Sequence, residues 1–301
     1  MHRKQVFKIL SFVLFWVVLT SPSWAGQVVT KEVRLWAKKA LEEEKALRLV
    51  SGQNTVAVLY FQNKTGQPEL DPLQKGIPLL LLTDLSNVKG LQVIERIKLQ
   101  ALVEEIGLGT SGLVEFHAAP RAGRLLGARW LIGGDISKGS IGIQSNLLDV
   151  PGQKVIGQSM VKGDLPELFR LEKDLLFEIL KLLKIEVPPE EERELRKPCS
   201  TNIRALMALF KAIHESDRGN YEKAAEHYEK ALKEDPEICV ARSALEELQA
   251  LGLIRLNKRS RGLLRSLRDR SSVTDQLTPE DSTKRTISPD RQPSKIPGEY
   301  K

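Results

Sequence analysis

The sequence predicts a β-sheet domain with helices on its faces (α/β or α+β), followed by a small all-helical unit. Three observations support this prediction. Short β-rich apolar runs alternate with helical patterns over residues 54–187. The alternation stops at residues 188–200, which are rich in proline and glutamate and are expected to form a linker. Residues 201–254 then follow only the helical period.

The sheet domain is predicted to open with a buried strand, because the apolar run Thr55–Phe61 ends at the turn cluster Asn63–Gly66. An amphipathic helix at Lys31–Leu49, within residues 26–53, is expected to pack over the sheet. The further elements predicted up to Asp135 are a helix at Pro72–Val88, a strand at Leu91–Glu95, helices at Ile97–Ile106 and Ala118–Leu126, and a strand at Trp130–Asp135.

A β-hairpin is predicted next and is expected to extend the sheet. Ser140–Val150 and Val155–Lys162 both alternate in hydrophobicity, and Pro151–Lys154 supplies the turn between them. Leu165–Ile185 then has the pattern of a strongly amphipathic helix, which the prolines at 188 and 189 end, because proline cannot continue the hydrogen-bond ladder.

The first 25 residues predict export. Arg3, Lys4 and Lys8 precede an apolar stretch at Ile9–Leu19, and cleavage is expected after Ala25. The apolar stretch is shorter than the roughly 20 residues that span a bilayer, which disfavours an uncleaved anchor. We therefore expect a soluble protein of the periplasm, with association to the outer membrane as a further option.

The charge is concentrated at the ends of the chain. The formal charge is +7, yet residues 255–301 hold 12 basic and 6 acidic residues, and residues 26–254 carry −2. No nucleic-acid partner is expected, because phosphate binding needs basic residues clustered on a defined face. The run Arg255–Arg270 contains leucines, so it is either an amphipathic element for an anionic envelope surface or a solvated helix end. From Ser271 the composition predicts disorder.

The sequence offers no convincing catalytic, cofactor or metal site. Cys199 and Cys239 are either one disulfide, which an exported protein could form, or two buried thiols. His214 and His227 lie near Cys239 without the spacing of zinc ligands. The glycine spacing of Gly107–Gly112 matches the dinucleotide-binding motif, but these residues follow a predicted helix, whereas the motif requires a preceding strand. We therefore expect no enzyme and no cofactor.

The segment Thr55–Ile185 resembles the CsgG-like family, named for the curli secretion channel. The residues that carry the resemblance are Val56–Asn63 with Gly76, Val93–Arg96, Gly123–Gly134, and Leu148–Val150 with Val155 and Gly157. The same unit occurs in outer-membrane lipoproteins that activate penicillin-binding proteins, and in the amino-terminal domain of the Tol-system propeller protein. The resemblance implies a periplasmic, non-enzymatic adaptor domain. No cysteine lies near the end of the signal and no lipid-facing strand pair is present, so a pore is not expected.

Residues 219–236 resemble a tetratricopeptide repeat. The motif residues, named as a candidate protein-binding set, are Gly219, Tyr221, Ala224, Tyr228, Ala231 and Pro236. The preceding helix, Asn202–Ser216, departs from the repeat pattern, and a single repeat cannot bury its faces alone. The helix Glu237–Leu251 is therefore expected to pack against it.

The leading functional hypothesis is an exported adaptor that binds cell-envelope proteins in envelope assembly or secretion, as a monomer or a homo-oligomer. The alternative is a protein that binds an anionic membrane or the cell wall through Arg255–Arg270. A ligand-binding or hydrolytic protein is the third hypothesis. The sequence alone does not identify the partner.

Overall fold

The computed structural model describes residues 27–44, 52, 54–106, 119–138, 141–255 and 258–276. Several predictions fall at least partly outside these ranges: the signal with its cleavage after Ala25, the end of the first helix, the Gly107–Gly112 loop, the first residue of the predicted helix at 118 and of the predicted hairpin at 140, residues 256–257 of the basic run, and the tail beyond residue 276.

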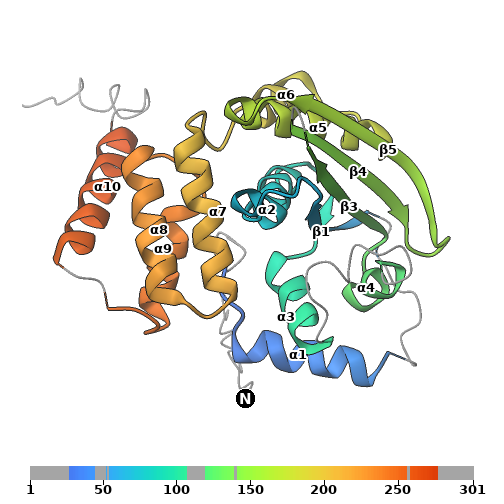
Figure 1. Cartoon of the computed structure of the whole chain (residues 1–301), viewed down its shortest axis with the longest axis horizontal. Coiled ribbons are helices and arrows are strands. Elements are labelled where there is room, and N and C mark those ends of the chain that lie inside the picture. Colours follow the sequence, from blue (N-terminus) through green and yellow to red (C-terminus); the bar gives the residue numbers. More distant parts are fainter. Residues whose placement is uncertain are drawn as a thin grey trace, which may run out of the picture.

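The described residues contain one mixed five-stranded sheet with the strand order β2-β1-β3-β4-β5 (Figure 1). Strand β1 lies between β2 and β3 and pairs in parallel with both, whereas β3, β4 and β5 are successively antiparallel. The strands are β1 (Thr55–Asn63), β2 (Gln92–Val93), β3 (Trp130–Ser137), β4 (Ile141–Asp149) and β5 (Lys154–Gly163). The predicted hairpin is therefore β4–β5, and it extends the sheet as expected.

Helices cover the two faces of the sheet. One face packs against α2 (Leu73–Leu85) and α5 (Leu168–Leu182). The other packs against α1 (Lys31–Glu42), α3 (Arg96–Ile106) and α4 (Ala119–Leu126), through side chains such as Ala37, Leu99 and Leu125. This arrangement confirms the predicted fold class.

The segment between the two predicted units contains a short helix, α6 (Pro189–Leu195), although a linker was expected there. Proline suits the first position of a helix, and the three glutamates that follow it favour the positive end of the helix dipole. Leu195 is buried. The chain between the sheet and the helical unit is therefore packed against the rest of the protein.

The helical unit consists of α7 (Ile203–Asp217), α8 (Tyr221–Glu234), α9 (Ala241–Ala250) and α10 (Lys258–Gln276). Gly219, at φ 77°, forms the tight turn between α7 and α8, a backbone conformation that glycine adopts without strain. The prediction of disorder from Ser271 is wrong for residues 271–276, which belong to α10.

A continuous hydrophobic core joins the helical unit to the sheet. Helix α7 lies between α2 and α8 (Figure 1). At the contact with α2, a Cβ atom on Gly76 would come within 2.2 Å of the Phe210 ring, so only glycine permits this approach. The face of α7 toward the sheet is thus covered by the protein's own α2.

Candidate protein-binding surface

Buried charges lie where α7 meets the sheet domain. The Asp217 carboxylate at the end of α7 accepts hydrogen bonds from Arg96 Nη1 at 2.8 and 3.0 Å and from Lys75 Nζ at 2.6 Å. The side chains of Arg96 and Asp217 are each 1% exposed. Two cations from α2 and α3 therefore share one counter-charge from the helical unit. We call Lys75, Arg96 and Asp217 the junction cluster.

Hydrogen bonds extend the junction cluster into the sheet. Lys75 Nζ also donates to Gln100 Oε1 at 3.2 Å, and the Tyr60 hydroxyl donates to the same oxygen at 2.5 Å. Burial raises the pKa of Tyr60 and lowers that of Lys75. Burial also opposes the charge of Arg96, but the neighbouring groups, with the Asp217 carboxylate foremost and Tyr60 next, together outweigh it and raise the pKa of Arg96. Asp217 thus stabilises a charge that would be costly on its own.

The chain before α1 ties the two units together a second time. Arg96 donates to the carbonyl oxygen of Gln27 at 2.7 Å and to its side-chain oxygen at 3.1 Å. From the other side, the Glu247 carboxylate of α9 accepts the N–H groups of Gln27 at 2.7 Å and Val28 at 3.3 Å. Residues 27–29 therefore form a strap between α3 and α9.

The sequence analysis missed the junction cluster. Arg96 appeared only as part of the family resemblance, and nothing in the sequence marked Lys75 or Asp217. The Arg96–Asp217 pair spans 121 residues, and no local pattern encodes a pairing at that distance. The sequence feature that could have indicated the cluster was the presence of ionisable residues on otherwise apolar helix faces.

The tetratricopeptide motif residues have a structural role in the described fold. Ala224, Tyr228 and Ala231 are wholly buried inside the helical unit, which corrects their assignment as contacts for a partner. Gly219 forms the interhelical turn, Tyr221 begins α8, and Pro236 follows its end. Ala224, Tyr228 and Ala231 therefore hold the helix pair together from inside, whereas Tyr221 is only partly buried.

The two cysteines are bonded to each other in the structure. Cys199 and Cys239 have an S–S distance of 2.02 Å and lie on either side of the α7–α8 pair. Closing 40 residues in this way is worth about 4 kcal/mol on the chain-entropy estimate. Cys239 is therefore no free thiolate for a zinc ion beside His214 and His227, and the described residues hold no group of three metal-ligating side chains.

The basic run at the carboxyl end packs against the helical unit. Leu264 and Leu267 of α10 are buried in the shared core. Ser260 donates a hydrogen bond to Glu229 of α8, and Arg268 pairs with Glu246 of α9 at 3.1 Å. The side chains of these two leucines are buried in the protein core and are therefore not available to insert into a membrane. Arg255, Arg261 and Arg265 remain exposed.

The most accessible apolar side chains of the sheet lie on β5. Among the described residues this strand ends the sheet order, and Figure 1 shows it at the rim of the sheet. Ile156 is 42% and Met160 49% exposed, and both lie between the exposed Lys154 and Lys162. Ile156 is the extra residue of a β-bulge, since Gly157 pairs with Leu147 and Val155 with Leu148. We call the free side of Lys154–Lys162 the β5 edge.

No helix within the described ranges is long and apolar enough to cross a bilayer.

Comparison with solved structures finds partial likenesses. The carboxy-terminal domain of LpoB from Salmonella enterica has 18% sequence identity and a TM-score of 0.31, with 43% of this chain and 95% of that chain covered. The same domain from Escherichia coli has 17% identity and a TM-score of 0.31, with 42% and 95% covered. The NMR structure of Escherichia coli LpoB has 16% identity and a TM-score of 0.32, with 43% and 64% covered.

No curated protein matches the chain. Residues 37–145, about a third of the chain, match the family model described as "Curli production assembly/transport component CsgG". This region runs from α1 to the middle of β4. The chain therefore contains a CsgG-like domain.

Proposed function

We propose that this protein is a non-enzymatic adaptor of the bacterial cell envelope, which binds an extended segment of another protein along the β5 edge. The observation that carries the proposal is the exposed pair Ile156 and Met160 on an unpaired edge strand. Such edges accept a further strand through main-chain hydrogen bonds. The CsgG family match and the predicted export signal support the envelope setting.

The β5 edge favours an acidic partner. Lys154 and Lys162 flank the apolar side chains, so the complementary segment has an apolar centre and acidic residues at its ends. A second copy paired antiparallel about Gln158 would place Lys154 opposite Lys162, and like charges directly opposite each other repel. The edge therefore suits a different protein better than a second copy of this one.

The direct test is a photo-crosslinking amino acid at Gln158 in living cells. We expect a discrete crosslinked product with an envelope protein. The product is lost when Ile156 and Met160 are both changed to Asp, because the apolar contact disappears and the acidic segment is repelled. The control is Leu251→Asp, which alters a side chain of similar exposure (47%) on the helical unit. It should leave the product unchanged. Absence of any product, or equal loss in the control, would refute the proposal.

The alternative of anionic-surface binding is tested in the same cells with a chain ending at Ile254. The adaptor proposal expects the Gln158 product to persist, because α10 lies on the helical unit, away from the sheet (Figure 1). Loss of envelope association together with the crosslink would favour the basic segment as the primary contact.

A further inference from the structure

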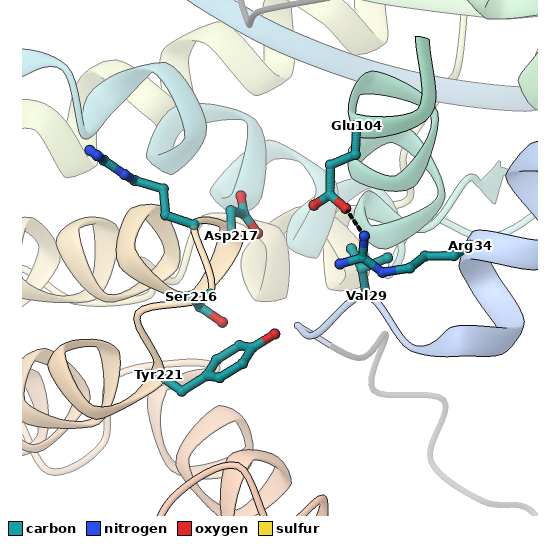
Figure 2. A pocket seen from close by; sticks show the side chains of 8 residues that line it. Val29, Arg34, Glu104, Ser216, Asp217 and Tyr221 are labelled. Atoms are coloured by element: carbon teal, nitrogen blue, oxygen red, sulfur yellow. Dashed lines mark ion pairs between the residues drawn. The ribbon is translucent and has the colours of Figure 1, made fainter. Parts of the chain in front are cut away.

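A small polar pocket lies beside the junction cluster, where three parts of the chain meet. It has a volume of about 270 Å³ and is lined by Arg34 of α1, Glu104 of α3, and Ser216, Asp217 and Tyr221 around the α7–α8 turn. Figure 2 shows the Ser216 and Tyr221 hydroxyls on one side and Arg34 with Glu104 on the other. The pocket thus collects side chains from both units of the protein.

The acceptors in this pocket already have partners. One Glu104 oxygen accepts a hydrogen bond from Gln100 at 3.0 Å, and the other lies 2.7 Å from Arg34 Nη1. Both Asp217 oxygens bind the two buried cations of the junction cluster. The carboxylates are therefore occupied and have little capacity for a bound cation.

Apart from Glu104 Oε2, which has its ion pair with Arg34 but no hydrogen bond of regular geometry, the unused groups of the pocket are donors. Ser216 is 5% exposed, and its Oγ interacts with the buried Tyr228 hydroxyl without either oxygen making a hydrogen bond of regular geometry among the described residues. The Tyr221 hydroxyl makes no hydrogen bond within the same residues. Arg34 uses one of its nitrogens for Glu104. A buried hydroxyl without a regular hydrogen bond is costly, so the site is prepared for an acceptor from outside.

The local charge also favours an anion. Arg34 and Arg218 line the pocket, and with Lys75 and Arg96 behind Asp217 they outnumber the carboxylates Glu104, Asp217 and Glu215 around it. Tyr221 is the first residue of α8, and the N-cap residue Asn220 donates to Glu215 at 2.7 Å instead of capping the helix, so the positive end of the helix dipole lies at the same wall.

We propose that this pocket binds a carboxylate group. Arg34 supplies the charge, and the Ser216 and Tyr221 hydroxyls donate hydrogen bonds to the carboxylate oxygens. The group is the end of an acidic side chain, the carboxyl terminus of a protein, or a small free carboxylic acid. The proposal is independent of the β5 edge, because β5 lies at the rim of the sheet and none of its residues lines the pocket (Figure 1).

The test is an NMR titration of the exported, ¹⁵N-labelled protein with acetate and with acetamide at constant ionic strength. Acetate should cause saturable shifts of the Gly219 and Tyr221 amide signals, and acetamide, which lacks the charge, should not. The double variant Ser216→Ala, Tyr221→Phe should weaken acetate binding about tenfold or more, because two hydrogen bonds to a charged group are lost. Arg34→Gln should abolish it.

The matched control is Lys38→Gln, which removes the same charge from an exposed position of α1 outside the pocket. It should bind acetate as the unchanged protein does. Circular dichroism and thermal unfolding would establish that each variant is folded. Equal shifts with acetamide, equal weakening in the control, or no saturation in the folded unchanged protein would overturn the proposal.

A second titration identifies the source of the carboxylate. Two glycine–serine peptides are compared with acetate, one with a free carboxyl terminus and one with an internal glutamate and an amidated end. Tighter binding of the first assigns the site to a chain terminus, and tighter binding of the second to an acidic side chain. If neither exceeds acetate, the site is assigned to a small free acid.

Discussion

Asp217 is the side chain whose loss of charge should destabilise the folded protein most. Its carboxylate is the shared counter-charge of Lys75 and Arg96, and Asp217→Asn leaves two buried cations without it. We expect a loss of about 3–5 kcal/mol in the free energy of unfolding, measured by urea denaturation. The control Asp174→Asn removes an exposed partner of Arg170 and should cost at most about 1 kcal/mol. Equal losses would contradict the role assigned to the junction cluster.

Glu172 is a second residue that should affect stability, because its protonation makes the free energy of unfolding depend on pH. It is buried between α2 and α5, where Asp84 and Lys173 form an ion pair. Burial, and then the nearby Asp84 charge, raise the pKa of Glu172 well above its ordinary 4.5. The native state therefore binds this proton more tightly than the unfolded state. The resulting stabilisation is full below pH 4.5 and is lost as the pH rises through the raised pKa.

The measurement is urea unfolding between pH 4.5 and 8 for the unchanged protein and for Glu172→Gln. The glutamine cannot ionise, so the variant should lose stability less steeply with rising pH. Glu178→Gln, an exposed change on the same helix, should leave the slope as it was. Parallel curves for the unchanged protein and Glu172→Gln would show that Glu172 does not set the slope.

At the scale of elements, the contact between α2 and α7 depends on Gly76. Gly76→Ala should cost about 1–3 kcal/mol, because the added methyl overlaps the Phe210 ring. Phe210→Ala alone creates a cavity, and the double variant should recover part of the loss, which a double-mutant cycle of urea unfolding measures. Gly262→Ala, with no atom within 4 Å of the new Cβ, should be neutral or stabilising. Strict additivity would mean that α7 does not pack here.

Local patterns predicted the elements because hydrophobic period and turn residues act within one segment. The run Thr55–Phe61 and the turn after Val150 gave β1 and the hairpin within a few residues. Helix α6 was missed because its apolar content is low, although Pro189 and the following glutamates are good start signals. The local pattern was also insufficient for Leu264 and Leu267 of α10. Their spacing allowed a helix but did not indicate whether a membrane or the protein itself would cover it.

For the whole molecule, the shared core predicts that the sheet domain does not fold alone. A chain ending at Lys197 lacks Asp217, so Lys75 and Arg96 would be buried without their counter-charge. We expect a collapsed ¹H–¹⁵N spectrum and no cooperative thermal transition. A chain ending at Ile254 keeps α7, α8 and α9 and should unfold in one transition. A well-dispersed spectrum from the shorter chain would show that the two parts are independent domains.

The strap at residues 27–29 has a consequence for the order of events during biogenesis. Gln27 and its carboxylate partner Glu247 are separated by 220 residues. Whether the polypeptide leaves the ribosome or an export channel, residues 27–29 emerge first and Glu247 emerges much later. The strap can meet Arg96 early, but its hydrogen bonds to Glu247 cannot form until α9 has been delivered. The contact between the strap and α9 is therefore a late step of folding, and a polypeptide that stops before Glu247 cannot form it.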